Sequence, residues 1–418
     1  MVVQTDRYWY VRGRAGWPAQ RHAASVEPEG PMTDPAKPAP SILDFGLFTG
    51  VPQHENFCRV DELVATRPIP ASPTPRPWPA GDPEELPKAF SFAGAERSTA
   101  AFLQDTDTAA VLVLRDGAVR TAWYGLTGGP DVRWLSMSVA KSVVSALVGI
   151  AVEEGAIGGV QDAISDYVPV DPGSAYDGVT IRDVLRMSSG ARWNEDYNDP
   201  TADIFRLGAA MAGADGGLDR FVAAMVPEAE PGTVCRYNSG DTQALGALLR
   251  RATGRTLTDY TTERLTDPLG TTAPGAWLVD PAGTEVAFAG LLLTAEDFAR
   301  VGELYRNGGR VGDHQVVPEA WVRDSTRWAA PHLAPGAPIV GDHRFALGYG
   351  HQWWLPDGDR GEFSAIGVYN QFVYVDPPSG TVVVKLSANR RYGTTPDEAT
   401  NREEETIALL RAIARTGE

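Results

Sequence analysis

The chain has 418 residues and a formal net charge of −17, from 37 Lys and Arg against 54 Asp and Glu. This length can bury a large core in one domain or two. The acidic balance, with no basic run, argues against nucleic acid or an anionic membrane surface as a partner. Two cysteines and six scattered histidines show no disulfide framework and no metal-ligand spacing, so we expect neither a metal nor a cofactor.

The first 40 residues are rich in Pro, Ala, Arg and Glu and have no periodicity. We expect residues 1–40 to be either disordered or an over-long gene prediction, with Met32 as an alternative start. No uninterrupted apolar segment follows a basic start, so we expect no secretory signal or anchor and a cytoplasmic protein. Residues 41–100 carry many prolines and are predicted to wrap over the surface as an extended arm.

The first firm elements lie between residues 109 and 152. Asp116 and Gly117 separate two β-rich runs, which predicts a tight antiparallel hairpin over 109–124. Residues 134–152 are almost continuously apolar and hold a single charge, Lys141. Because this run is shorter than the ~20 residues that a membrane span needs, we predict a helix buried on all sides.

A serine precedes the buried lysine on the same helix face. Burying an ammonium group is costly, so Lys141 should snorkel to the surface, pair with an acid, or serve a site that uses a lowered pKa. Ser138 lies three positions earlier, which places a hydroxyl beside the amine, as a nucleophile beside a base. A serine three residues before a lysine also arises by chance in many chains, so the pair alone does not decide the function.

The later elements complete an α/β pattern. Strands at both ends of the chain, with helices between them, predict an α/β domain from 41–135 and 290–418 and an inserted, mostly helical domain over 136–289. A cleft between the two would be the natural site. The predicted helices cover 180–190, 241–254, 294–308 and 404–415, and the predicted strands cover 351–354, 372–376 and 381–386.

Two further segments carry candidate site residues. The loop 192–200 is too polar to be buried without a reason and too aromatic for a linker, so it is predicted to line a pocket. Tyr237 stands just before a helix start. A tyrosine whose pKa is lowered by a nearby ammonium group can shuttle protons to a leaving group, although a lone loop tyrosine is more often a packing residue.

Four segments together resemble the serial motifs of the class C β-lactamase and penicillin-binding serine hydrolases. They are residues 138–141, 180–190, 237–239 and 294–300, and the resemblance spans residues 90–395. Residues 135–142, 193–200 and the strands near 375 and 385 are more narrowly similar to the 6-aminohexanoate-dimer hydrolase branch. Members of that branch cleave carboxylic esters and a linear nylon-oligomer amide. The implied fold is β-lactamase-like, with an antiparallel sheet from both chain ends flanked by helices.

The resemblance implies a role for each matching residue. Ser138 would be the acylated nucleophile, Lys141 its activating partner and Tyr237 the proton relay. The amides of Ser138 and Val368 would form an oxyanion hole. The residues implied or expected to contact the substrate are Tyr197, Gly367, Trp193 and Tyr369, although each aromatic ring could merely pack.

Some positions depart from the family pattern. Ala365 and Ile366 replace the cationic or hydroxyl residues of the third motif, which weighs against a β-lactam substrate. Tyr369 and Asn370 replace a His-Gly pair. We therefore predict a serine hydrolase that acts on a small ester or linear amide. The alternatives are a β-lactamase or D-alanyl carboxypeptidase, or a catalytically silent binding protein on the same scaffold; the sequence does not define the oligomeric state.

Overall fold

The computed structural model describes residues 42–340, 343–344, 346–395 and 397–416. The predicted disorder of residues 1–40 lies outside these residues. Pro40–Glu418 forms one compact unit. Within the described part of the chain, none of the helices combines the length and apolarity needed to cross a membrane.

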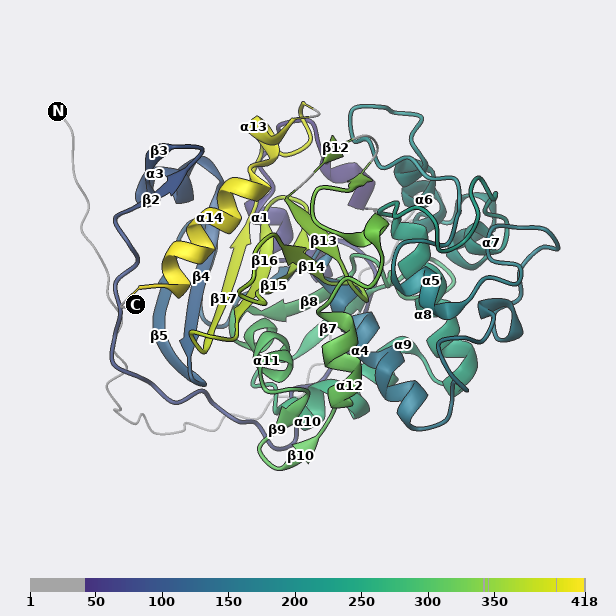
Figure 1. Ribbon diagram of the computed structural model, residues 1–418, viewed down its shortest axis with the longest axis horizontal. Helices are drawn as coiled ribbons and strands as arrows, with labels where there is room; N and C mark the ends of the chain where they lie inside the picture. Colours follow the sequence, from purple (N-terminus) through teal and green to yellow (C-terminus); the bar gives the residue numbers. More distant parts are fainter. Residues whose placement is uncertain (1–41, 341–342, 345, 396, 417–418) are drawn as a thin grey trace, which may run out of the picture. The chain divides into compact units, whose positions relative to one another are not determined.

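A seven-stranded antiparallel sheet is built from both ends of this unit (Figure 1). Two strands precede the long apolar helix in sequence and five come from the C-terminal part, as predicted. The strand order is β13-β14-β15-β16-β17-β4-β5. The strands are β4 (Thr108–Arg115), β5 (Ala118–Tyr124), β13 (Leu347–Tyr349), β14 (Trp354–Pro356), β15 (Phe363–Gly367), β16 (Gln371–Asp376) and β17 (Thr381–Ser387).

The predicted hairpin is confirmed. Asp116 and Gly117 join β4 to β5 with φ values of 51° and 72°, the left-handed conformation that a tight two-residue hairpin turn requires. β17 pairs with β4 from Thr381 opposite Arg115 to Ser387 opposite Thr108. This pairing therefore joins the two N-terminal strands of the sheet to its five C-terminal strands.

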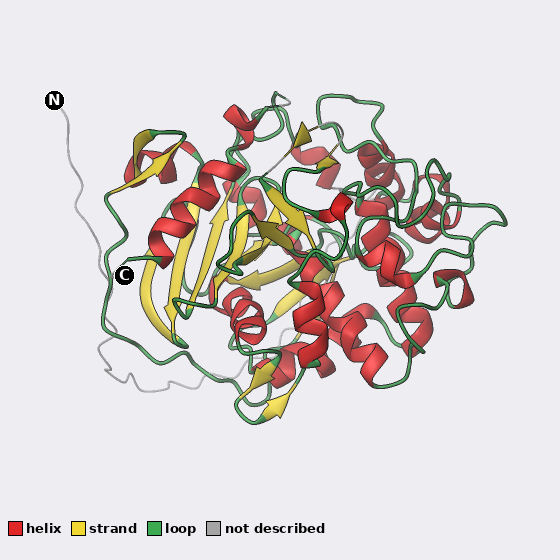
Figure 2. Cartoon of the chain, viewed as in Figure 1, coloured by secondary structure: helices red, strands yellow, loops and turns green. Residues whose placement is uncertain are grey.

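Different helices cover the two faces of the large sheet (Figure 2). Successive residues of a strand point to opposite faces. Leu112 and Leu114 belong to the core cluster on the side of α11 (Ala295–Arg306), whereas Val111 and Val113 belong to the cluster that includes α14 (Glu403–Ala414). The strands β14, β15, β16 and β17 are buried at every position, which explains why they read as nearly continuous apolar runs.

A smaller antiparallel sheet has the order β1-β7-β8-β6. Its first strand, β1, lies in the Pro-rich segment that we predicted to be an extended surface arm, and β1 is indeed extended, with one buried residue. The prediction was wrong for α1 (His54–Phe57) and α2 (Val60–Leu63), which are helical. β1 is an edge strand, where the missing N–H of Pro68 is tolerated. The strands are β1 (Thr66–Ile69), β6 (Arg133–Leu135), β7 (Gly275–Leu278) and β8 (Leu291–Thr294).

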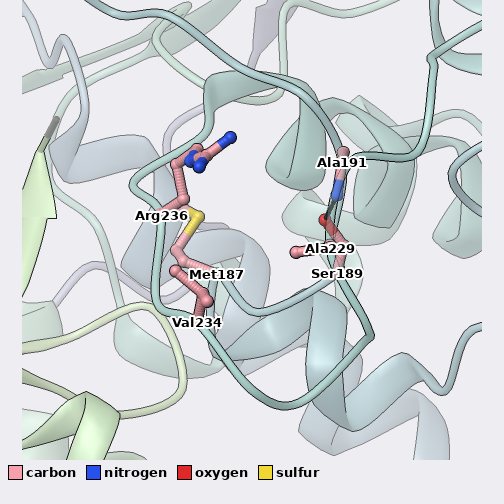
Figure 3. Close-up of a pocket in the computed structure, with 7 residues that line it drawn as sticks. Met187, Ser189, Ala191, Ala229, Val234 and Arg236 are labelled. Atoms are coloured by element: carbon pink, nitrogen blue, oxygen red, sulfur yellow. Dashed lines mark hydrogen bonds between the residues drawn. The ribbon is translucent and has the colours of Figure 1, made fainter.

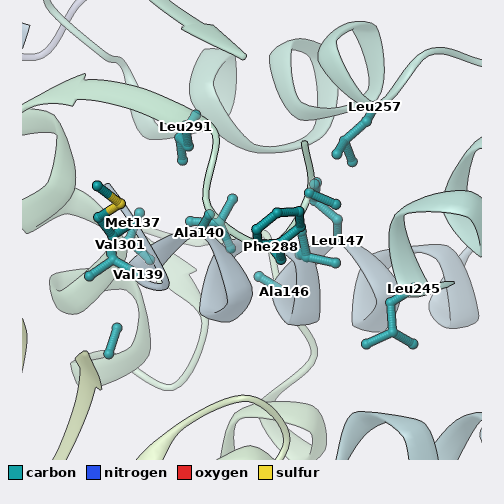
Figure 4. Packing of buried hydrophobic residues seen from close by; sticks show 14 of the residues in the cluster. Met137, Val139, Ala140, Ala146, Leu147, Leu245, Leu257, Phe288, Leu291 and Val301 are labelled. Carbon is teal, nitrogen blue, oxygen red and sulfur yellow. The ribbon is translucent and has the colours of Figure 1, made fainter. Parts of the chain in front are cut away.

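The long apolar helix, α4 (Val139–Glu153), begins later than predicted because residues 133–135 form β6 and pair with β8. α4 packs against α8 (Ser239–Thr253). Side chains from all sides surround it, including Leu245 of α8 and Phe288 from the segment before β8 (Figure 4). The prediction of a helix buried on all sides is confirmed, and α4 is a rigid platform for whatever its first turn carries.

The other predicted elements differ from the structure mainly at their ends. The expected helix 180–190 is shorter, α5 (Ile181–Leu185), with the Thr180 hydroxyl accepting from Asp183 N as its N-cap. The expected strand 351–354 was wrong for its first residues, because Gln352 has a φ of 62° and β14 begins at Trp354.

The remaining elements are short and lie around the two sheets. The helices are α1 (His54–Phe57), α2 (Val60–Leu63), α3 (Thr99–Asp105), α6 (Asp203–Met211), α7 (Gly217–Ala223), α9 (Leu257–Thr261), α10 (Asp267–Leu269), α12 (Glu319–Ser325) and α13 (Glu398–Asn401). The paired strands are β2 (Ala89–Phe92) with β3 (Ala95–Ser98), β9 (Arg310–Val311) with β10 (His314–Gln315), and β11 (Pro338–Val340) with β12 (His343–Arg344).

Candidate active site

Ser138 lies at the turn between β6 and α4. Met137 before it has a φ of 46°, a left-handed conformation that is strained for a residue with a side chain. Ser136 N donates to Leu291 O over 2.8 Å, which ties the turn to β8. The strand, the sharp turn and the helix together hold the Ser138 hydroxyl at the N-terminus of a rigid element.

The Lys141 amine lies among oxygen atoms, and no carboxylate of the residues that the structure describes is in direct contact with it. Its Nζ is 2.8 Å from Ser138 Oγ, 3.1 Å from Ser239 Oγ and 3.0 Å from the backbone oxygen of Phe288. Lys141 is 1% exposed. Burial lowers its pKa to about 8, and the charge of Glu195 opposes that shift. Lys141 was expected to snorkel to the surface, pair with an acid, or serve a site that uses a lowered pKa. The structure supports the third of these alternatives.

Tyr237 completes a group of three side chains with Ser138 and Lys141. Its hydroxyl is near enough to the Ser138 side chain for that side chain to oppose the rise of the Tyr237 pKa, and Lys141 Nζ lies 5.0 Å from the centroid of its ring. Burial raises the Tyr237 pKa well above its ordinary value, with the charge of Glu195 adding to the rise. Our expectation that a nearby ammonium group lowers this pKa was wrong, because desolvation dominates. The buried phenol is a proton donor and not a tyrosinate.

The end of β15 lies against the backbone of the Ser138 turn. A methyl group on Gly367 would lie 2.7 Å from Ser136 O and 2.9 Å from Ser138 N, so only a glycine allows this approach. Val368 follows at the start of the β15–β16 turn. Among the described residues, neither the Ser138 amide nor the Val368 amide donates a hydrogen bond to a protein acceptor. Two unused N–H groups beside a serine hydroxyl are what an oxyanion hole requires.

A buried carboxylate, Glu195, links the loop 192–200 to these residues. Its oxygens accept from Trp193 Nε1 over 2.6 Å and from the Tyr197 hydroxyl over 3.1 Å. It also accepts from the Ser239 hydroxyl over 2.9 Å. Trp193 and Tyr197, both predicted to contact the substrate, therefore reach Lys141 through Glu195 and Ser239.

An aromatic cluster around Phe48 forms a wall beside Tyr197 and Tyr369. The Phe48 ring stacks on Tyr197 with the centroids 3.9 Å apart and lies 5.3 Å from the Tyr369 ring. Phe48 N donates to the Tyr369 hydroxyl over 2.7 Å. Tyr369 is 1% exposed, so its ring packs within this cluster, and any contact of it with a substrate stays a prediction.

A small pocket lies next to Arg236, the residue before Tyr237, and Ser138 is not among the residues that line it (Figure 3). The loop 187–191 lines it together with Ala229, Val234 and Arg236. Arg236 N donates to Met187 O over 2.7 Å, so one wall of the pocket is the segment that precedes Tyr237. Among the residues that the structure describes, no three His, Cys, Asp or Glu side chains are grouped to hold a metal ion.

Sequence reasoning missed Glu195, Phe48 and the carbonyl of Phe288. Glu195 did carry one signal, because an acidic residue between aromatic residues in a pocket loop is unusual for a packing segment. Phe48 carried none. Its contact with Tyr369 joins residues 321 positions apart, which no local pattern reveals.

Comparisons with known proteins agree with this architecture. The sequence model of the Beta-lactamase family matches residues 95–408. The 6-aminohexanoate-dimer hydrolase of Paenarthrobacter ureafaciens is 31% identical over 343 residues, which cover 79% of this chain and 84% of that protein. A solved structure from Bacillus anthracis, provisionally assigned as a 6-aminohexanoate-dimer hydrolase, has a TM-score of 0.76 at 22% identity and covers 87% of this chain and 94% of its own. A family VIII carboxylesterase has a TM-score of 0.57 at 17% identity, covering 76% of this chain and 95% of its own.

The chain belongs to the Beta-lactamase family. Within that family it is similar to the 6-aminohexanoate-dimer hydrolases, as the motifs predicted. The β-lactamase-like fold class is confirmed as well.

Proposed function

We propose that this chain is a serine hydrolase that cleaves carboxylic esters, or linear amides, through an acyl-enzyme on Ser138. The observation that carries the proposal is the 2.8 Å contact between Lys141 Nζ and Ser138 Oγ, at an amine whose pKa burial lowers to about 8. A neutral amine at this distance can take the hydroxyl proton as the oxygen attacks a carbonyl carbon.

The first half of the reaction forms the acyl-enzyme. Ser138 Oγ bonds to the carbonyl carbon, its proton moves to Lys141, and the amides of Ser138 and Val368 stabilise the negative oxygen. Tyr237 then protonates the departing alcohol or amine as its bond to the carbonyl carbon breaks, and the proton held by Lys141 restores the phenol. Water reverses these roles on the acyl-enzyme and releases the carboxylic acid.

The choice of substrate class has separate support. The relatives include a protein named for a linear amide dimer and another named as a carboxylesterase. Ala365 and Ile366 are buried apolar residues of β15, so these two positions offer neither a cation nor a hydroxyl to the carboxylate of a β-lactam. Esters should react faster than amides, because an alkoxide leaves more easily than an amide anion.

Covalent labelling tests the proposal. Incubation with a fluorophosphonate is expected to add one phosphonyl group to the protein, and peptide mapping is expected to locate it on Ser138. An unlabelled protein that also fails to turn over p-nitrophenyl butyrate would favour the silent binding protein instead. A stable adduct with labelled penicillin, without ester turnover, would favour the penicillin-binding alternative.

The pH dependence of ester hydrolysis follows from Lys141. Its amine must be neutral to accept a proton, and with a pKa of about 8 only about one molecule in ten is neutral at pH 7. We expect kcat/KM for p-nitrophenyl butyrate to rise about tenfold per pH unit below pH 7 and to level off above pH 8. A midpoint near pH 10, the range of an exposed lysine, would contradict the assignment of Lys141 as the base.

Tyr237→Phe should separate good leaving groups from poor ones. Its phenol supplies the proton that an alkoxide or amide anion needs, whereas p-nitrophenolate leaves without one. We expect kcat/KM to fall about 10²–10⁴-fold for ethyl butyrate and about tenfold for p-nitrophenyl butyrate.

Tyr349→Phe is the matched control for Tyr237→Phe. Tyr349 is a buried tyrosine whose ring packs edge-on against Tyr237, with the centroids 6.0 Å apart. It should leave the ratio of the two rates unchanged. Equal losses on both esters in Tyr237→Phe would mean that Tyr237 only supports packing.

A further inference from the structure

A chain of hydrogen bonds leads from a buried carboxylate to the nucleophile, and its direction bears on the proposed function, on which this inference rests. Glu195 accepts four hydrogen bonds from the described part of the chain. Two come from Trp193 and Tyr197, and two come from Ser239, through its hydroxyl over 2.9 Å and its amide over 3.2 Å. Ser239 in turn contacts Lys141, and Lys141 contacts Ser138.

The hydrogen-bond partners of Glu195 are donors. Trp193, Tyr197 and Ser239 present N–H and O–H groups to its two oxygens. Ser239 is the first residue of α8, so the carboxylate also faces the N-terminal end of a 15-residue helix, which attracts negative charge. An ionised carboxylate can only accept hydrogen bonds.

This fixes the direction of the Ser239 hydroxyl. A serine has one O–H hydrogen, and at Ser239 that hydrogen is donated to Glu195 Oε1. The lone pairs of the same oxygen remain to face Lys141 Nζ, 3.1 Å away. Ser239 can therefore only accept from the lysine amine. The Phe288 carbonyl, 3.0 Å from the amine, can only accept as well.

The neutral amine of Lys141 has two N–H groups and one lone pair. Ser239 and the Phe288 carbonyl take one N–H group each, so the lone pair is left for the third neighbour, Ser138 Oγ, at 2.8 Å. We propose that Glu195 is a positioning residue: by committing the Ser239 hydroxyl to itself, it directs the lone pair of Lys141 at Ser138.

The charge of Glu195 also acts on the pKa of Lys141. Of the residues placed in the structure, the titratable groups that face Lys141 are Glu195 and Tyr237, and Glu195 raises the lysine pKa against the lowering by burial. Removing the charge should move the lysine midpoint to lower pH. A carboxylate that merely held the loop 192–200 through Trp193 and Tyr197 would also shift this midpoint, but its removal would lower stability and leave the plateau of kcat/KM unchanged.

Glu195→Gln in the full-length protein tests the proposal. The amide nitrogen of Gln can donate to Ser239, which frees the serine hydrogen to point at Lys141 and occupy its lone pair. We expect the plateau of kcat/KM for p-nitrophenyl butyrate to fall about 10²-fold. In the pH profile of kcat/KM, the midpoint of the acid limb should lie at a lower pH than in the wild type. Glu195→Asp, which keeps the charge, should return this midpoint to the wild-type pH.

Glu362→Gln is the matched control, because Glu362 is also a buried carboxylate that accepts from a tyrosine hydroxyl, that of Tyr374. It should leave both the plateau and the midpoint unchanged. A double-mutant cycle adds a second test. If Glu195 acts through Ser239, combining Glu195→Gln with Ser239→Ala should cost no more than about twofold beyond Ser239→Ala alone.

The outcomes separate this inference from the proposed function. If the wild type takes no fluorophosphonate and turns over no ester, the proposed function fails and the inference fails with it. If the wild type is active and Glu195→Gln keeps the plateau of kcat/KM, or if the double mutant shows additive losses, the inference alone is overturned.

If the Glu195→Gln variant does not fold, two substitutions of Ser239 test the proposal instead. Ser239→Thr keeps a hydroxyl and should retain most activity, whereas Ser239→Ala should lose it. Equal activity in the two variants would overturn the proposal.

Discussion

Ser138→Ala is expected to abolish hydrolysis of p-nitrophenyl butyrate, lowering kcat by at least about 10⁴-fold. Without Oγ no acyl-enzyme forms, and the remaining groups can only polarise the carbonyl for direct attack by water. The variant should also take no fluorophosphonate label. Because the change removes one polar atom at the first turn of a rigid helix, the thermal unfolding midpoint should change little.

Ser142→Ala is the control for Ser138→Ala. Ser142 lies one turn further along α4, and its hydroxyl donates to Gln352 O over 2.6 Å, away from Ser138. We expect it to retain kcat and labelling. Turnover that persists in Ser138→Ala but is lost in Ser142→Ala would identify Ser142 as the nucleophile and contradict the proposed site.

Gly367→Ala is expected to lower kcat about 10²–10³-fold while the fold persists. The added methyl group would lie 2.7 Å from Ser136 O, 2.9 Å from Ser138 N and 3.0 Å from Met137 Cβ. These are backbone atoms and a Cβ, which cannot move aside without shifting the turn or the strand. Either shift separates the Ser138 amide from the Val368 amide and opens the proposed oxyanion hole.

The loss in Gly367→Ala should appear in kcat more than in KM, because the two amides bind the oxyanion more strongly than the neutral carbonyl. Gly159→Ala is the control, since a methyl group there meets no atom within 4 Å. Unchanged kcat in Gly367→Ala would show that the amides of Ser138 and Val368 do not act together.

The parts of this fold that sequence reasoning reached are those with local causes. Asp116 and Gly117 define a hairpin because their own left-handed conformations make the turn. Thr180 caps a helix by accepting from Asp183 N, only three residues away. The start of α4 was misplaced because β6 exists only through its pairing with β8, contributed by residues 291–294. No pattern within residues 134–152 contains that information.

The same distinction holds for the site. Ser138 and Lys141 share a helix face, so their contact follows from spacing alone. Tyr237 required a resemblance to a family, since its approach to Lys141, 96 positions away in the sequence, is a tertiary contact. The direction of its pKa could not be obtained from residue types, because it depends on how completely the ring is buried. Glu195 needed the contact with Ser239, which sequence does not encode locally.

The construction of the large sheet from both ends of the chain also bears on biosynthesis. A ribosome delivers the Ser138 turn and α4 long before it delivers β15 with Gly367, and β17, which closes the sheet against β4, comes later still. The chemistry of the proposed site needs atoms from both regions. Any nascent chain that still lacks its C-terminal strands therefore carries the serine without the opposing wall, and hydrolytic competence arises only once synthesis is nearly finished.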